Sequence, residues 1–266
     1  MIRYSFTKIR KDSRSTYFAW VHLLIYYNLS LPVVWVIANF TNLTPNNVTM
    51  IHFVIRLITV YPFYLGSPDA LRIGGILVLI CTVIDVADGR LARLKNQMSP
   101  LGAYMDPMLD SIGDFLIMAA LTYSQGVLTN DLSFMFLGMA FVFMNLFVST
   151  ENMHLALIRQ KIIINDDYKS KSISKVNTEA AKIGIISQIA AKAKSFQKRY
   201  GISLVSIDVI EIRFIVYILG PIIGYVKECI IIGVVLLVMK VVWEKSMQIY
   251  RKEPVFFVNK EKDGLS

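Results

Sequence analysis

The sequence predicts an all-α integral membrane protein, a bundle of six transmembrane helices preceded by an N-terminal interfacial amphipathic helix. Two observations carry this prediction. Of the 266 residues, 55% are hydrophobic and only 18% are charged, a balance that soluble domains of this length rarely have. The apolar residues also form runs close to the about 20 residues that a helix needs to cross a bilayer.

The expected helices follow in chain order. Residues 16–40 are uncharged and rich in aromatic residues, but Asn28, Ser30 and Pro32 interrupt the apolar run, so we expect one or two interfacial helices here. Thr44 and Pro45 then form a helix start, because threonine caps the first turn and proline fits the first helical position. The six predicted spans are residues 46–65, 70–95, 103–124, 132–158, 206–224 and 229–248.

The basic residues predict the orientation. The loops 66–69, 125–131 and 225–228 contain hardly any Lys or Arg, whereas 90–95, 159–199 and 245–252 are rich in them. By the positive-inside rule, both termini are expected on the cytoplasmic side of the cytoplasmic (inner) membrane. The net charge of +9 comes from residues beside hydrophobic segments, so membrane lipids with anionic headgroups are the expected partners and nucleic acid is not.

One membrane domain is expected. It covers residues 46–250, after a basic N-terminus and interfacial helix over 1–45 and before a cytoplasmic tail over 251–266. Residues 177–200 have a lysine-rich face, which predicts an amphipathic helix lying on the headgroups. No signal peptide is expected. Cys81 and Cys229 lie inside apolar runs, which argues against a disulfide framework or a cysteine metal site.

A group of acidic residues carries the chemistry. Asp85 and Asp88 are spaced i,i+3 at the end of the second predicted span, and Asp106 and Asp110 are spaced i,i+4 near the start of the third. The short connection between these spans brings the four carboxylates together at the edge of the hydrocarbon. Carboxylates so close in a low dielectric hold protons or bind cations, and an all-oxygen ligand set favours Mg²⁺ or Mn²⁺.

Small residues and an arginine complete a longer pattern with these acids. The chain matches the signature D-x2-D-G-x2-A-R-x8-G-x3-D-x3-D at every defined position, and so resembles the CDP-alcohol phosphotransferase family. The matching residues are Asp85, Asp88, Gly89, Ala92, Arg93, Gly102, Asp106 and Asp110. A Thr44-Pro45-Asn46 element and the six predicted spans extend the resemblance over most of the chain.

The resemblance implies transfer of a substituted phosphoryl group from a CDP-activated donor to an alcohol, with release of CMP, in phospholipid biosynthesis. It implies two divalent ions, Mg²⁺ or Mn²⁺, and usually a homodimer. In such enzymes Asp85, Asp88 and Asp106 hold metal, and Asp110 helps with metal and acts as the catalytic base. The implied donor contacts are Asn46, Asp85, Gly89, Ala92, Arg93 and Gly102. The structural alternatives are helix packing for the three small residues, membrane orientation for Arg93 and a helix start for Asn46.

Further ionisable residues lie near the expected depth of the acids. We interpret them as candidates for an acceptor or headgroup pocket, with Arg213 the best candidate for a phosphate or polar-headgroup contact. They are Arg56, Asp114, Glu151, His154, Glu211 and Arg213. The alternatives are an internal ion pair for Arg56 and, for the others, side chains that snorkel to the interface.

The acceptor stays open. Asp114 resembles a third spaced aspartate of inositol-phosphate-type members, but Ser111 stands where those carry arginine, and the glycerophosphate, serine and aminoalcohol patterns do not fit. We favour a CDP-diacylglycerol or related CDP-lipid donor with a small polar alcohol. The alternative is a CDP-linked phosphate or phosphonate headgroup transferred to a lipid alcohol such as diacylglycerol. A six-span cation transporter is a third possibility, although it would not need the glycine, alanine and arginine at these spacings.

Overall fold

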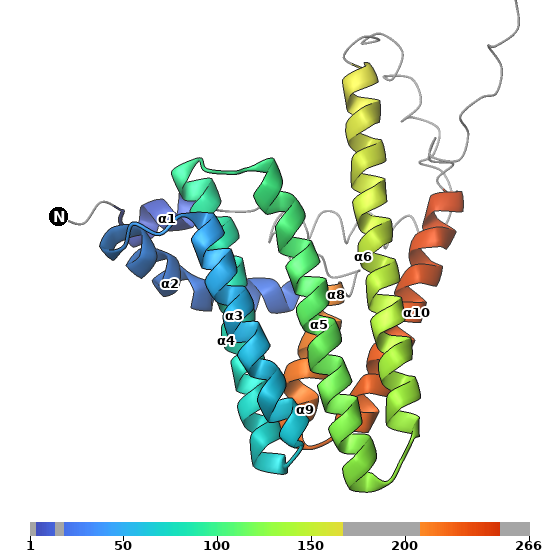
Figure 1. Cartoon of the computed structure of the whole chain (residues 1–266). Helices are drawn as coiled ribbons and strands as arrows, with labels where there is room; N and C mark the ends of the chain where they lie inside the picture. The colour runs from blue at the N-terminus through green and yellow to red at the C-terminus, as the bar shows by residue number, and fades with distance from the viewer. Residues whose placement is uncertain (1–3, 14–18, 167–207, 251–266) are drawn as a thin grey trace, which may run out of the picture.

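The computed structural model describes residues 4–13, 19–166 and 208–250, and every regular element within those ranges is a helix (Figure 1). Two of the segments, η1 and η3, are π-helical. The elements are α1 (Phe6–Asp12), η1 (His22–Tyr26), α2 (Tyr27–Phe40), α3 (Pro45–Leu65), α4 (Pro68–Lys95), α5 (Pro100–Thr129), α6 (Ser133–Asp166), α8 (Val209–Arg213), η3 (Phe214–Leu219), α9 (Gly220–Ile223) and α10 (Val226–Tyr250). The predicted all-α class is confirmed. The helix predicted over 177–200 lies outside the described residues.

Within the described residues, five helices are long and apolar enough to cross a membrane. They cover His22–Phe40, Pro45–Leu65, Pro68–Lys95, Gly102–Thr129 and Ser133–Glu151. The last four coincide with four of the predicted spans. The first covers the segment that was expected to lie in the interface, and the two last predicted spans are helical over 209–223 and 226–250 but are not among the five.

Pro32 does not divide the N-terminal segment. One continuous helix runs from η1 through α2, and the side-chain amide of Asn28 donates to the carbonyls of Leu23 and Leu24 at 3.4 and 3.0 Å, beside the wide π-helical turn. In Figure 1, α1 and α2 run across the direction of the main bundle, near the end where α4 leads into α5. Ile9 and Val34 pack there against Leu91 of α4.

The helix starts use the same local chemistry three times. Thr44, Ser67 and Ser99 each accept a hydrogen bond on the side-chain oxygen from a backbone N–H in the first turn, and a proline follows each of them. The predicted start at Thr44 and Pro45 is therefore confirmed. Asn96 ends α4 in the left-handed region with φ 52°, which lets the chain turn back within a few residues. This short turn places the last turns of α4 beside the first turns of α5.

At the other end of the bundle, the end of α3 and the α5–α6 connection make close contacts with neighbouring helices. Gly66, at φ 68°, ends α3, and a Cβ there would lie 2.7 Å from Ser124 of α5. In the α5–α6 connection, Asp131 pairs with Lys227 of α10 at 2.6 Å. Hydrogen bonds from Lys227 and Ser133 lower the pKa of Asp131 to about 2, so this pair stays ionised at neutral pH.

Candidate active site

The four signature aspartates converge where α4 meets α5. Asp85, Asp88 and Asp106 each offer a carboxylate oxygen, and these three oxygens lie within 4.8 Å of one another. Asp85 also forms a second group of this kind with Asp110 and His52. The predicted convergence of the four acids is therefore present, and the acids share a neighbour on α3, His52.

Two buried carboxylate oxygens in this group have no hydrogen-bond donor in the part of the chain that the structure describes. They are Oδ1 of Asp85 and Oδ1 of Asp106. A buried charged oxygen without a donor is strongly unfavourable, and a hard divalent cation supplies the missing partner. The ligand atoms present are carboxylate oxygens with one imidazole nearby, so the residues fit Mg²⁺ or Mn²⁺.

Asp88 is oriented by a hydroxyl group of α3. Thr49 Oγ1 lies 2.6 Å from Asp88 Oδ2 and donates to it, and Asp88 is 5% exposed. Sequence reasoning missed Thr49. A signal was available, because Thr49, His52, Arg56 and Thr59 follow one another at helical spacing and make one polar stripe along an otherwise apolar helix.

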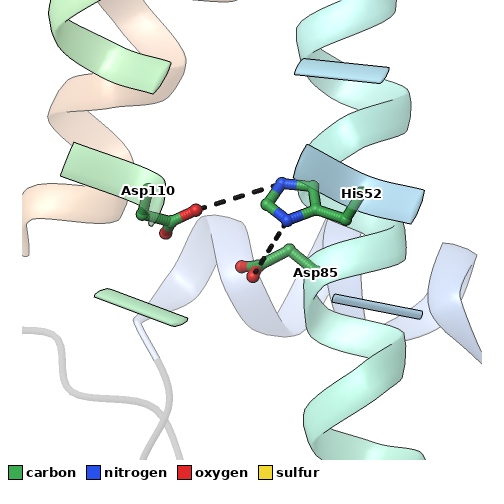
Figure 2. A group of neighbouring side chains, drawn as sticks. All are labelled: His52, Asp85 and Asp110. Atoms are coloured by element: carbon green, nitrogen blue, oxygen red, sulfur yellow. Dashed lines mark ion pairs between the residues drawn. The ribbon is translucent and has the colours of Figure 1, made fainter. Parts of the chain in front are cut away.

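His52 lies between two of the acids (Figure 2). Its Nδ1 is 3.9 Å from Asp85 Oδ1, its Nε2 is 3.9 Å from Asp110 Oδ1, and the side chain is 1% exposed. Arg56 Nη1 lies 3.3 Å from Nε2. Since a guanidinium can only donate, Nε2 accepts this bond and a neutral imidazole carries its proton on Nδ1, on the side of Asp85.

Arg56 and Arg213 meet at Asp114. Arg56 donates to Asp110 Oδ1 at 2.6 Å and also to Asp114. Arg213 Nη2 lies 2.9 Å from Asp114 Oδ2, and its Nη1 is 3.7 Å from Asp110 Oδ2. Asn145 of α6 donates to Asp114 at 3.3 Å. Asp114 thus holds the two arginines beside Asp110, so the functional and ion-pair interpretations of Arg56 apply to the same contacts.

Arg56 needs a glycine on α5. A Cβ at Gly113 would lie 2.3 Å from Cδ and 2.5 Å from Nε of Arg56, far closer than real Cβ contacts. The side chain of Arg56 therefore crosses α5 at a position where that helix carries no side chain. In the sequence, the only sign of a role for Gly113 is its position directly before Asp114.

A pocket opens beside this network. Its lining includes Tyr26 of η1 and Tyr217 of η3, so both π-helical segments present residues to it, as such segments often do at functional sites. The charged part of the lining consists of Arg56, Asp85, Asp110, Asp114 and Arg213, and Thr82 adds a hydroxyl group. Three of the six predicted pocket residues, Arg56, Asp114 and Arg213, are therefore brought together with two of the signature acids.

The other three predicted pocket residues lie elsewhere. Glu151 pairs with Lys245 of α10. His154 is exposed on α6. Glu211 accepts a bond from the backbone N–H of Val21 at 3.3 Å and takes part in the capping box that starts α8. None of the three lines the pocket, because Glu151 and Glu211 have other partners and His154 is exposed.

The remaining signature residues flank the acids. A Cβ at Gly102 would lie 3.1 Å from Oδ1 of Asn46, so these two candidate donor contacts are neighbours. A Cβ at Gly89 would meet only the guanidinium of Arg93, at 3.7 Å, so no other helix among the described residues packs against it. Ala92 is half-buried on the same helix. Close helix packing therefore does not account for Gly89.

Comparison with known proteins agrees with these residues. The family model described as CDP-alcohol phosphatidyltransferase matches residues 42–210, more than half of the chain. This range contains the whole acidic cluster together with α3, α4, α5 and α6.

Curated relatives match over shorter stretches. An archaetidylinositol phosphate synthase of Pyrococcus horikoshii is 32% identical over 93 residues, which is 35% of this chain and 47% of that protein. A bifunctional IPC transferase and DIPP synthase of Rubrobacter xylanophilus is 35% identical over 32% of this chain and 19% of its own length. A CDP-diacylglycerol–glycerol-3-phosphate 3-phosphatidyltransferase of Rickettsia bellii is 30% identical over 26% of this chain and 38% of its own length. The matched stretches thus span less than half of each of these relatives.

Proposed function

The chain belongs to the CDP-alcohol phosphatidyltransferase family, and from that premise we propose that it transfers a substituted phosphoryl group from a CDP-activated donor to an alcohol, releasing CMP. The favoured pair is CDP-diacylglycerol or a related CDP-lipid with a small polar alcohol. The observation that carries the proposal is the convergence of Asp85, Asp88 and Asp106 with two oxygens that lack donors. The relatives named as synthases and phosphatidyltransferases support the reaction class.

Asp85, Asp88, Asp106 and Asp110 would hold two divalent ions, Mg²⁺ or Mn²⁺. When bound, such ions neutralise charge on the diphosphate and stabilise the leaving group. The protein's own part is to gather the ligands from two helices and to fix their orientation, as Thr49 does for Asp88.

Asp110 is the proposed base. Its carboxylate faces the pocket, where Arg56 fixes one of its oxygens at 2.6 Å. An acceptor hydroxyl in the pocket gives its proton to Asp110 as its oxygen forms the new bond to phosphorus, and the bond from phosphorus to the CMP oxygen breaks. We assign Arg56, Arg213 and Asp114 to the acceptor pocket. Glu151 and Glu211 are left out because of their other contacts, and His154 because it is exposed on α6.

The donor's nucleotide end is assigned to the faces of α4 and α5 beside the acids. Gly89 and Gly102 carry no side chain there, and Ala92 carries a small one, which leaves room for a base and ribose. Arg93 and Asn46 supply polar contacts at the edge of this space. These assignments follow the family signature residue by residue.

The five apolar helices and the phosphatidyltransferase relatives indicate an integral membrane protein. We propose that α3, α4, α5, α6, the α8–α9 segment and α10 span the bilayer, and that α1 and α2 lie at its cytoplasmic face. The orientation of α1 and α2 across the bundle supports this arrangement (Figure 1). The basic residues at the end of α4 favour the cytoplasmic side of the inner membrane. A homodimer is part of the proposal.

A substrate panel tests the reaction. Purified protein with Mn²⁺ is offered CDP-diacylglycerol, CDP-linked headgroups and a set of alcohols, and CMP release is measured. We expect CMP from a CDP-lipid with a small polar alcohol. CMP release only from a CDP-linked headgroup with diacylglycerol would assign the alternative donor, and no CMP from any pair, with Asp110→Asn indistinguishable from wild type, would reject the enzyme and favour cation transport.

Thr49→Val is expected to weaken metal binding. The substitution keeps the shape of the side chain but removes the donor to Asp88 Oδ2, and loss of such an orienting contact costs roughly tenfold or more in metal affinity. The readout is the Mn²⁺ concentration that gives half-maximal CMP release. Thr59→Val is the matched control, since Thr59 is buried on the same helix and its hydroxyl contacts the carbonyl of Ile55 and the thiol of Cys81, not a signature aspartate. Equal effects of the two variants would contradict the assigned contact.

A further inference from the structure

Arg90 is a buried cation that the family signature leaves undefined. It lies on α4 two residues after Asp88, and its side chain is wholly buried, with 0% exposure. Within residues 4–13, 19–166 and 208–250, no carboxylate lies within ion-pairing distance of it. A buried guanidinium without a counter-ion is unfavourable unless other groups accept its hydrogen bonds. The groups that accept hydrogen bonds from Arg90 therefore determine what holds it in place.

Among the described residues, the acceptors of Nε and Nη1 all belong to the N-terminal segment, and the buried Nη2 has no acceptor. Arg90 Nε donates to Ser13 Oγ at 3.1 Å. Its Nη1 donates to the carbonyl of Tyr27 at 2.6 Å and to Ser30 Oγ at 2.8 Å. The guanidinium carbon also lies 4.0 Å from the centre of the Tyr27 ring, in cation–π contact. Arg90 thus fastens both α1 and α2 to α4.

Ser13 contacts both Arg90 and Arg93, and so links Arg90 to the candidate site. Its backbone carbonyl accepts a bond at 3.2 Å from Nε of Arg93, one turn further along α4. Its backbone N–H is itself held by the carbonyl of Ile9 at the end of α1. One residue therefore accepts from both arginines, with its hydroxyl facing Arg90 and its carbonyl facing Arg93.

The orientation of Arg93 matters because its Nη atoms face the donor side. A Cβ at Gly89 would lie 3.7 Å from Nη1 and 3.9 Å from Nη2 of Arg93, so the guanidinium lies over the glycine beside Asp88. No ion pair joins Arg93 to a carboxylate of the described ranges. Its Nε is used by Ser13, which leaves the two Nη groups to a ligand over Gly89.

We propose that Arg90 is a positioning residue for the donor, acting through Ser13 to set the guanidinium of Arg93 over Gly89. The inference rests on the proposed function, in which that place takes the cytidine diphosphate end of the donor. It makes the N-terminal helices part of the donor site without any contact between them and the donor. It also predicts that Arg90 and Arg93 act on donor affinity as one unit.

A double-mutant cycle tests this coupling. Arg90→Gln, Arg93→Gln and the double variant are compared with wild type for binding of CDP in the presence of Mg²⁺ and for the donor KM and kcat of CMP release. We expect Arg90→Gln to weaken CDP binding and raise the donor KM about tenfold, with kcat and acceptor KM little changed. In the Arg93→Gln background the same change should have almost no further effect. Full additivity of the two substitutions would overturn the proposal.

Serine variants keep the test decisive if Arg90→Gln does not fold. Ser13→Ala removes the hydroxyl that Arg90 uses and should raise the donor KM, an effect that Arg93→Gln abolishes. Ser30→Ala removes another acceptor of Arg90 outside this link and should leave the donor KM unchanged, as should Arg72→Gln on an exposed arginine of the same helix. A purely structural role would lower the thermal midpoint of Ser13→Ala and Ser30→Ala alike and leave both KM values at the wild-type level.

The proposed function can fail separately. If wild type binds CDP and releases CMP but the cycle is additive, only the role of Arg90 is rejected. If wild type neither binds CDP with Mg²⁺ nor releases CMP, the proposed function is rejected, and the role of Arg90 with it.

Discussion

Asp85→Asn is expected to reduce CMP release by at least about a thousandfold, equivalent to about 4 kcal/mol of lost transition-state stabilisation. Asp85 belongs to both groups of candidate ligands, so its carboxylate is the one shared between the proposed metal positions. Asparagine keeps the size of the side chain but removes the charge. The measurement is the rate of CMP release at saturating donor, acceptor and Mn²⁺.

The same variant should be more stable than wild type when no metal is added. Four carboxylates converge there, and Oδ1 of Asp85 is buried without a donor, so removing one charge relieves repulsion in the folded protein. Wild type should gain thermal stability on addition of Mg²⁺, because a ligand of the folded state stabilises it, and Asp85→Asn should gain much less.

Asp69→Asn is the matched control for this prediction. Asp69 lies in the first turn of the same helix, its side chain is 88% exposed, and its partner is Arg72. We expect wild-type activity and a wild-type response to Mg²⁺. An Asp85→Asn protein that kept its activity would remove Asp85 from the site, and one that lost activity with a normal response to Mg²⁺ would assign it a role other than metal binding.

Gly113→Ala is expected to destabilise the protein by at least about 3 kcal/mol and to abolish activity. The new methyl group would lie 2.3 Å from Cδ of Arg56, so the arginine or α5 has to move. If Arg56 moves, Asp110 loses its hydrogen bond and Asp114 loses one of its two arginines, which leaves buried charge uncompensated. The measurements are the thermal midpoint in detergent and the rate of CMP release.

Gly126→Ala on the same helix separates this clash from any general effect of alanine. A Cβ at Gly126 would have its nearest neighbour at 3.4 Å, an ordinary contact, and alanine favours helix over glycine by roughly 1 kcal/mol. We expect this variant to be as stable as wild type or slightly more so, with full activity. Equal destabilisation of the two variants would show that Arg56 does not lie over Gly113.

Local signals in the sequence determined much of this protein. The start of α3 at Thr44 and Pro45 follows from capping chemistry that involves only neighbouring residues. The convergence of Asp85 and Asp88 with Asp106 and Asp110 follows from helical spacing and a connection too short to separate the helix ends. The proposed reaction class follows from the resemblance of the same residues to the family signature, whose defined positions all lie within one helix–turn–helix segment.

Only the tertiary structure decided how distant charges pair. Helical periodicity says which residues share a face, but it does not say which neighbouring helix that face meets. The sequence placed Arg56, Asp114 and Arg213 in one candidate pocket with Glu151 and Glu211. Packing joins the first three in one network, whereas Glu151 pairs with Lys245 and Glu211 lies at the start of α8.

Small residues and undefined positions gave the sequence argument least to work with. Gly113 matters because the side chain of Arg56, 57 positions earlier, needs its space, and Arg90 matters because Ser13, Tyr27 and Ser30 fold back onto α4. Such contacts are set by the shape of the whole bundle. The sequence alone therefore determined the proposed chemistry and the place of its acidic residues on α4 and α5, and the packing of the helices decided which charges pair around them.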